Sequence, residues 1–389
     1  MSKLKDSLIV KLLVAVVLGV ILGLAVNETI MKVIMPIKYV LGQFINFCVP
    51  LIIIGFITPS ITKLKSNASR MLRSVLIIAY LSSVGAAAFS MISGYLIIPG
   101  LHIDSSAEGL KKLPELVFQL DIPGIMPVMT ALVFSIIMGL TIIWTNSKTL
   151  QNVFEEFNNI VLKIVTKMVI PVLPIFIATT FTELAYEGSI TKQLPVFISV
   201  ILIVLIGHFI WMTLLYAIGG FLSKKNPVEV FKHYGPAYLT AIGTMSSAAT
   251  LSVELQCAQK SSVLDRDVLE FTLPICSNIH LCGSVLTETF FVMTVSKILY
   301  GSLPEISTMI TFILLLGIFA IGAPGVPGGT VMASLGLITG VLGFNQSGVA
   351  LILTIFALQD SFGTACNITG DGAIALMMTG LYGKNKVKA

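Results

Sequence analysis

Four polar side chains near the C-terminal end of the chain recur at the spacing of one helix face. They are separated by four, three and four residues: Asp360, Thr364, Asn367 and Asp371. On a helix this spacing forms a continuous polar stripe, although the sequence on both sides is strongly apolar. The two carboxylates need partners, and between positions 268 and 383 the sequence contains a single Lys, Lys297, and no Arg. The stripe therefore predicts a site for an ammonium group, a metal ion or a proton, rather than a purely structural seam.

The elements that must hold this stripe belong to a membrane protein. The 389 residues are 56% hydrophobic and 11% charged, with a mean hydropathy of +0.97, which excludes a soluble globular protein. The net charge of +5 comes from basic residues in short loops, so no nucleic-acid partner is expected. The first apolar run, residues 8–26, lacks a small-residue cleavage site and is predicted to be a retained span. The five cysteines have no paired spacing, so neither a disulfide framework nor a zinc site is expected.

The distribution of basic residues predicts the topology. They gather before residue 6, at 63–73, at Lys148, at 224–232 and after residue 383, and an excess of Lys and Arg marks cytoplasmic loops. We therefore expect a multi-pass protein of the cell (plasma) membrane with both termini in the cytoplasm. Six apolar segments that are long enough to span lie near residues 8–26, 37–60, 73–98, 125–145, 156–186 and 193–222.

Beyond residue 225 the apolar runs are interrupted. The stretch TMSSAATLSVE covers residues 244–254, and IGAPGVPGGT covers residues 321–330. Each apolar arm is too short to cross a bilayer alone, so the non-helical tips must be buried in protein or line a wet cavity. Gly/Pro kinks in an ordinary bundle are the alternative. Two breaks at corresponding places in successive halves favour re-entrant hairpins within an inverted repeat.

Four motifs follow one another in the second half: TMSSAATLSVE, NIHLCGS, GAPGVPGGT and DSFGTACNITGD. In this order they resemble the serine-rich hairpin, the NMDGT motif, the second hairpin tip and the last helix of the dicarboxylate/amino acid:cation symporters, the glutamate transporter homologues. The resemblance covers essentially the whole chain. It implies an all-α polytopic membrane protein with eight transmembrane segments and two re-entrant helical hairpins, assembled as a homotrimer that works as an elevator.

The resemblance also divides the chain into two parts. A scaffold would contain residues 1–72, with segments one and two, and residues 101–190, with segments four and five. A transport domain would contain the third segment at 73–100 and residues 191–389. The latter range holds segment six, a first hairpin (227–261), segment seven (264–299), a second hairpin (303–345) and segment eight (347–383).

Substrate contacts are carried over residue by residue from the resemblance. Asp360 matches the aspartate that holds the substrate's amino group, and Thr364 and Asn367 match its polar neighbours. Ser246 and Ser247 match first-hairpin serines that lie near the substrate carboxylate. The free backbone N–H groups at a hairpin tip are also suited to binding a carboxylate. The remaining substrate-binding positions are Gly322, Ala323, Gly325 and Val326 of the gate, together with Gly363.

Two departures from the family pattern concern the substrate. Relatives that carry acidic amino acids place an arginine in the last helix or in the first hairpin, where this chain has Gly363 and Met245. An acidic side chain would then be desolvated without its bidentate partner. We therefore expect a small neutral amino acid, with a sodium-coupled dicarboxylate or acidic amino acid symporter as the alternative.

Further departures concern the coupling ion. His280 and Cys282 replace the Asn and Asp of the NMDGT motif, and they suit sodium badly. Ala79 stands at the family's third-segment tyrosine, and Glu288 falls where excitatory amino acid transporters carry a glutamate associated with proton coupling. A hydrogen-bonded structural acid and a packed neutral ring are the alternatives for Glu288 and His280. The predicted coupling positions are Cys276, His280, Cys282, Glu288, Asn367 and Asp371, of which Asn367 and Asp371 are candidates for Na⁺.

The sequence thus predicts a secondary active symporter and no enzyme, with H⁺ favoured over Na⁺ as the coupling ion and no other cofactor. A membrane-embedded enzyme that uses His280, Cys282 and Asp371 is an alternative from another class, but no nucleophile lies in a recognisable elbow. A channel is a third alternative, although it would not need paired hairpin gates. The expected partners are a small-molecule substrate, the lipid bilayer and further copies of the chain.

Overall fold

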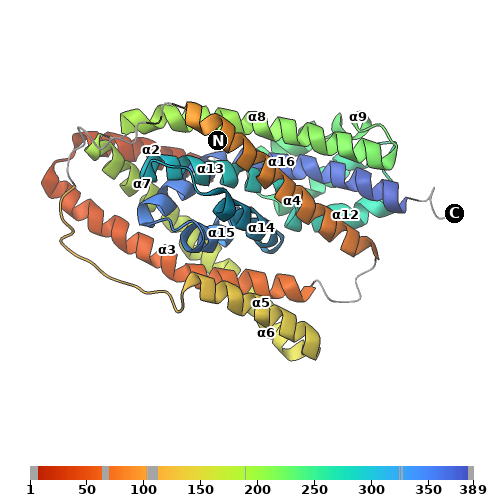
Figure 1. Ribbon diagram of the computed structural model, residues 1–389, viewed down its shortest axis with the longest axis horizontal. Coiled ribbons are helices and arrows are strands. Elements are labelled where there is room, and N and C mark those ends of the chain that lie inside the picture. The colour runs from red at the N-terminus through yellow and green to blue at the C-terminus, as the bar shows by residue number, and fades with distance from the viewer. Residues whose placement is uncertain are drawn as a thin grey trace.

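The computed structural model describes residues 8–63, 70–101, 103, 113–188, 190–323, 325 and 327–383, and within these ranges all regular structure is helical. The first half contains α2 (Leu8–Ala25), α3 (Glu28–Lys63), α4 (Arg70–Ile97), the 3₁₀ turn Ile98–Gly100, α5 (Val128–Thr145), α6 (Lys148–Ile164), the π turn Val165–Val169, α7 (Ile170–Glu187) and α8 (Ile190–Ser223). The second half contains α9 (Val228–Phe231), α10 (Gly235–Thr244), α11 (Ser247–Ala258), α12 (Arg266–Ile279), α13 (Cys282–Tyr300), α14 (Ile306–Gly322), α15 (Gly329–Gly340) and α16 (Gln346–Tyr382). In Figure 1, α3, α8 and α16 lie along the long axis and α4 crosses them obliquely.

Six helical stretches of the described chain are long and apolar enough to cross a membrane. They are Glu28–Pro59, Arg70–Gly100, Lys148–Glu187, Pro195–Ser223, Arg266–Tyr300 and Gln346–Tyr382. Shorter apolar helices include Val14–Ala25, Val133–Thr145, Ile306–Gly322 and Gly329–Gly340. Large apolar side chains such as Leu96, Trp144 and Phe221 expose 77%, 71% and 83% of their surface, as expected for side chains that face lipid. The chain is therefore an all-helical, multi-pass membrane protein.

Two helices begin earlier than their apolar segments predict. The segment near 37–60 lies in α3, which starts at Glu28, and the segment near 156–186 belongs to a helical stretch that starts at Lys148. The additional turns carry polar residues on one face, as in the α6 sequence KTLQNVFEEFNN. An apolar run marks only the part of a helix that is apolar all round, so amphipathic ends are missed.

Two pairs of short helices are joined by non-helical tips. Helices α10 and α11 meet at Met245, which is left-handed (φ 52°), and at Ser246, whose Oγ accepts a hydrogen bond from the Ala249 N–H at 3.3 Å. This serine cap begins α11. Helices α14 and α15 are separated by residues 323–328, which end at the left-handed Gly328 (φ 72°). A left-handed residue at each tip reverses the chain within a few residues.

Helix α16 is the centre of the second half. Nearly all of its residues from Gly348 to Gly380 are buried, and it packs against α8, α10, α12 and α13. The helical path breaks between α12 and α13 at His280 and Leu281, and this break lies against α16. A Cβ atom on Gly283 would lie 2.5 Å from the carbonyl oxygen of Gly363, so only glycine permits this approach.

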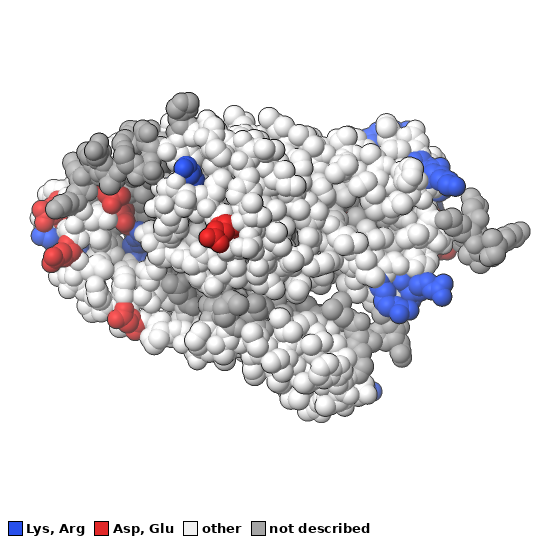
Figure 2. Space-filling view, in the orientation of Figure 1, with Lys and Arg blue, Asp and Glu red and all other residues white. Residues whose placement is uncertain are grey.

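Charged residues are concentrated at the two ends of the long axis. Figure 2 shows Lys and Arg at the end where α16 terminates, and most of the visible Asp and Glu at the opposite end. The membrane would cover the uncharged band between them. That the basic end faces the cytoplasm stays a prediction.

Candidate functional site

The carboxyl group of Asp360 lies at the second tip. Its side chain, on α16, is 4% exposed, and Oδ2 accepts a hydrogen bond from the Gly328 N–H at 2.7 Å. Gly328 precedes α15, so its N–H points toward the carboxylate from the start of a helix. The same carboxylate could accept an ammonium group in place of this N–H, because both are donors of similar reach.

The two tips touch each other beside Asp360. Ser246 Oγ donates a hydrogen bond to the Gly325 carbonyl at 2.6 Å. A Cβ atom on Gly325 would lie 3.2 Å from the Ser277 carbonyl and 3.4 Å from the Ala248 N–H nitrogen. Ser247 is buried in the first turn of α11. The first tip, the second tip and the end of α12 therefore close over one place in the molecule.

Of the four predicted gate positions, Gly325 lies at the junction of the two tips, and Gly322 and Ala323 lie just before it in the chain. Gly322 ends α14 and Ala323 follows it at 4% exposure. Gly325 makes the contact with Ser246. Val326 lies outside the described residues.

In the middle of the polar stripe, Asn367 forms hydrogen bonds with the start of α13. Asn367 Oδ1 accepts hydrogen bonds from the N–H groups of Gly283 (2.7 Å) and Ser284 (3.2 Å), and its Nδ2 donates to Ser284 Oγ at 2.9 Å. Asn367 thus satisfies the free donors at the start of α13. Thr364, also buried, lies one turn away toward Asp360. Gly363 has ordinary van der Waals space for a Cβ atom, 3.4 Å from Ser284 Cα.

The far end of the stripe contains a fully buried acid and imidazole pair. Asp371 Oδ1 lies 2.6 Å from His280 Nδ1, and His280 Nε2 lies 2.8 Å from Ser82 Oγ on α4. Asp371 and His280 both have 0% exposure. Both ring nitrogens are therefore used, and the imidazole fills the space beside the carboxylate.

The remaining coupling positions lie on α12 and α13. Glu288 accepts a hydrogen bond from Ser334 on α15, and its other oxygen, Oε2, has no partner within the described chain. Cys276 and Cys282 are buried free thiols. A Cβ atom on Gly370 would lie 3.1 Å from Cys282 Sγ, so this thiol packs against α16.

Two buried polar residues were missed from the sequence. His208 on α8 lies 2.9 Å from Thr287 Oγ1 and 3.1 Å from the Gly283 carbonyl, so it supports the start of α13. Glu254 on α11 has 0% exposure. A single carboxyl group within an apolar arm was the available signal for Glu254, and the adjacent charged loop at 260–267 concealed it.

No group of three or more His, Cys, Asp and Glu side chains in the described ranges is arranged to hold a metal ion. One oxygen of Asp371 is already bonded to His280, and the Asn367 amide is bonded to α13. Binding of sodium by Asn367 and Asp371 stays a prediction. The ion would have to be coordinated by oxygen atoms that do not take part in these hydrogen bonds, such as Asp371 Oδ2.

The comparisons with known proteins come from one family. The model of the "Sodium:dicarboxylate symporter family" matches residues 8–381. Excitatory amino acid transporter 1 of Ambystoma tigrinum is 27% identical over 279 residues, which cover 69% of this chain and 50% of that protein. Excitatory amino acid transporter 5 of Homo sapiens is 29% identical over 297 residues, which cover 74% of this chain and 52% of that protein. The chain thus spans about half the length of the curated relatives it matches.

Proposed function

Because the chain belongs to the sodium:dicarboxylate symporter family, we propose that it is a cation-coupled secondary transporter for a small neutral amino acid. One observation carries this proposal. Asp360 is a buried carboxylate at the junction of two helical tips, and its partner there is a backbone N–H of a tip. A substrate ammonium can take the place of that N–H only when the second tip moves away. Binding is thereby linked to a change at the gate.

The substrate's carboxylate would lie near the first tip. Ser246 and Ser247 stand at the start of α11, where unsatisfied N–H groups and the helix dipole favour an anion. Ser246 Oγ is bound to the Gly325 carbonyl in the closed arrangement. Displacement of Gly325 would free this hydroxyl to donate to the substrate. The two ends of an amino acid would then be held by different tips.

The absence of a fixed guanidinium supports a neutral side chain. Gly363 and Met245 occupy the two places where acid-transporting relatives carry arginine, and Lys297 forms a hydrogen bond with the Gly301 carbonyl at the end of α13. A second carboxylate on the substrate would be buried without a counter-charge. The alternative of an acidic substrate would need a basic group that enters the site in another state.

Proton coupling is supported by two features. The His280 ring takes up one oxygen of Asp371, where the family resemblance places a cation-coordinating carboxylate. Glu288 links α13 to the second hairpin through Ser334, so loss or gain of a proton there would change a contact of the gate. We therefore place H⁺ ahead of Na⁺ as the coupling ion, and we propose no other cofactor.

We propose that the chain forms eight transmembrane segments and two hairpins. Segments one to six would be α2, α3, α4, α5, the continuous α6–α7 stretch and α8; segment seven would be α12–α13, and segment eight α16. The hairpins would be α10–α11 and α14–α15. We infer that residues 1–72 and 101–190 form the scaffold, that residues 73–100 and 191–389 form the moving domain, and that three copies assemble in the cell membrane with the basic end in the cytoplasm.

Counterflow in proteoliposomes tests the proposed function. Liposomes that contain unlabelled serine, alanine or threonine should accumulate the labelled form of the same amino acid from outside, because a carrier exchanges substrate. Asp360→Asn should abolish this exchange, whereas Glu270→Gln, which removes an exposed acid on α12, should leave it unchanged. A channel would dissipate the gradient without accumulation, and an enzyme would alter the amino acid chemically. Either result would reject the proposal.

A further inference from the structure

Glu254 is a buried acid that the proposed transport mechanism does not use. It lies on α11, two turns after Ser247, and has 0% exposure. Both of its carboxyl oxygens lack a hydrogen-bond partner within the described chain. Among the described ion pairs, none joins it to a Lys or Arg. A carboxylate in this condition would be an uncompensated buried charge.

The groups around Glu254 come from every element packed on α11. Asp371 of α16 is near enough for its charge to act on Glu254, but the unpartnered oxygens show that no hydrogen bond joins the two acids. Glu254 also interacts electrostatically with Tyr216 of α8, Tyr234 before α10 and Cys276 of α12. None of these groups is a cation. The His280 ring is bonded to Asp371 and not to Glu254.

Neither neighbouring tyrosine hydroxyl forms a hydrogen bond with Glu254. Tyr216 donates its hydroxyl hydrogen to the Thr369 carbonyl at 2.9 Å. The Tyr234 hydroxyl has no partner in the described residues, and its ring packs against Gly372, where a Cβ atom would lie 2.6 Å from Tyr234 Cζ. Tyr234 and Gly372 are thus closely packed, and the Glu254 side chain is fully buried. Full burial without a hydrogen-bond partner favours the neutral form of Glu254 over the carboxylate.

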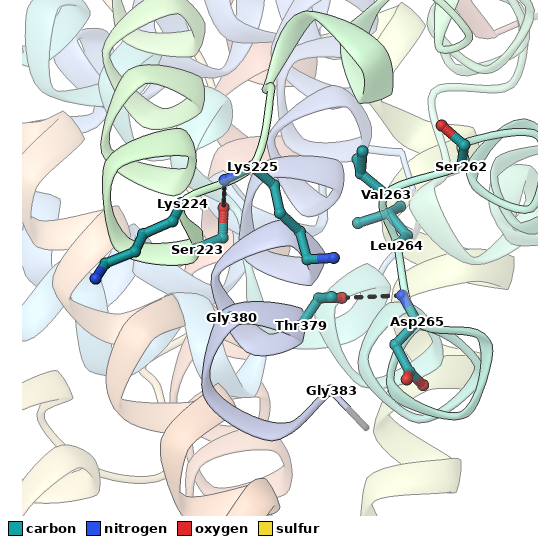
Figure 3. Close-up of a pocket in the computed structure, with 10 residues that line it drawn as sticks. All are labelled: Ser223, Lys224, Lys225, Ser262, Val263, Leu264, Asp265, Thr379, Gly380 and Gly383. Atoms are coloured by element: carbon teal, nitrogen blue, oxygen red, sulfur yellow. Dashed lines mark hydrogen bonds between the residues drawn. The ribbon is translucent and has the colours of Figure 1, made fainter. Parts of the chain in front are cut away.

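A polar cavity opens at the basic end of the same helices. It has a volume of about 420 Å³, and Lys225, Ser262, Asp265 and Thr379 are among its lining residues. In Figure 3, Lys225 points into the space between the end of α16 and the 262–265 loop, while Lys224 points away. Thr379 is eight residues after Asp371 on α16, a rise of about 12 Å. The cavity therefore reaches to within roughly two helical turns of Asp371 along α16.

We propose that Glu254 is a proton-binding site of the transport cycle, separate from Glu288, that loads and releases one proton for each substrate carried. The neutral acid forms when the carboxylate takes a proton from water on one side of the membrane. The proton returns to water on the other side after the first hairpin has moved, so no other reactant is needed. This inference rests on the proposed function, because it assigns a coupling ion to that transporter.

The test is the number of protons moved per substrate. Purified protein in liposomes is given fixed gradients of labelled substrate, and the pH gradient that stops net flux is measured. Glu254→Gln keeps the size of the side chain but cannot ionise. It should lower the ratio by one proton per substrate and leave counterflow exchange intact. Glu270→Gln is the matched control on an exposed site.

The outcomes separate this inference from the proposed function. A pH gradient at zero flux that is the same for Glu254→Gln and the unsubstituted protein would overturn the inference alone. Loss of exchange together with net uptake in Glu254→Gln would also overturn it, because the carboxyl group would then serve folding or substrate binding. If the unsubstituted protein shows no exchange with any amino acid tested, the proposed function itself fails.

Discussion

Replacement of Asp360 by Asn should remove the counter-charge for the substrate's ammonium group and preserve the shape of the site. The asparagine amide oxygen can still accept the Gly328 N–H that Oδ2 now accepts at 2.7 Å. The unliganded protein should therefore unfold at nearly the same temperature. The bound ammonium, however, would be buried beside a side chain that is only 4% exposed and no longer charged. Leaving one charge of a buried pair without its partner costs about 3–5 kcal/mol.

That free energy corresponds to a loss of affinity of roughly 10²- to 10⁴-fold. Isothermal titration of the purified protein with the amino acid that most raises its melting temperature measures this change directly. Ligand that stabilises the unsubstituted protein by mass action should give little or no shift with Asp360→Asn. Glu270→Gln, on the exposed side of α12, should bind like the unsubstituted protein. Equal affinity of Asp360→Asn and the unsubstituted protein would show that the ammonium lies elsewhere.

Three further predictions concern selectivity, coupling and packing. In competition uptake assays, serine, alanine or threonine should displace label better than aspartate at neutral pH, because Gly363 supplies no guanidinium; the reverse order would contradict this pocket. Glu288→Gln should lower the number of protons moved per substrate and so weaken uptake driven by a pH gradient, and removal of sodium should not weaken it; an unchanged proton ratio together with loss of uptake on removal of sodium would identify a sodium-coupled protein. Gly283→Ala should lower the melting temperature strongly, because its Cβ atom would lie 2.5 Å from the Gly363 carbonyl oxygen. Gly243→Ala should leave the melting temperature nearly unchanged, because no atom lies within 4 Å of its added Cβ atom. Equal effects of the two substitutions would refute the close packing.

The sequence is informative wherever a local pattern determines the outcome. Asp360, Thr364, Asn367 and Asp371 follow helical spacing, and all four lie on the single helix α16. The glycine, proline and serine clusters mark the ends of α10, α14 and their partners, because left-handed residues and a serine cap are local requirements. Apolar runs locate the helices and leave their amphipathic ends undetermined.

The partners of the polar stripe could not be predicted from spacing. The contact of Asp371 with His280 joins residues 91 positions apart, and that of Asp360 with Gly328 joins residues 32 apart. Such pairings depend on how α16 rotates against α12, α13 and α15. A single sequence carries no direct record of that rotation. The amide of Asn367 was expected in a binding role, and the structure shows it bonded to the start of α13.

The positions that depart from the family pattern are connected in space. His280 is bonded to Asp371, and α11, which carries the buried Glu254, packs against the same helix α16. A buried imidazole can supply internally the positive charge that a bound metal ion would otherwise bring to a carboxylate. Once one acid is neutralised in this way, a second acid nearby must carry a proton or destabilise the fold. Replacement of an oxygen ligand by histidine and retention of a buried glutamate are therefore consistent with one another, and together they support the proposal that transport is coupled to protons rather than to sodium.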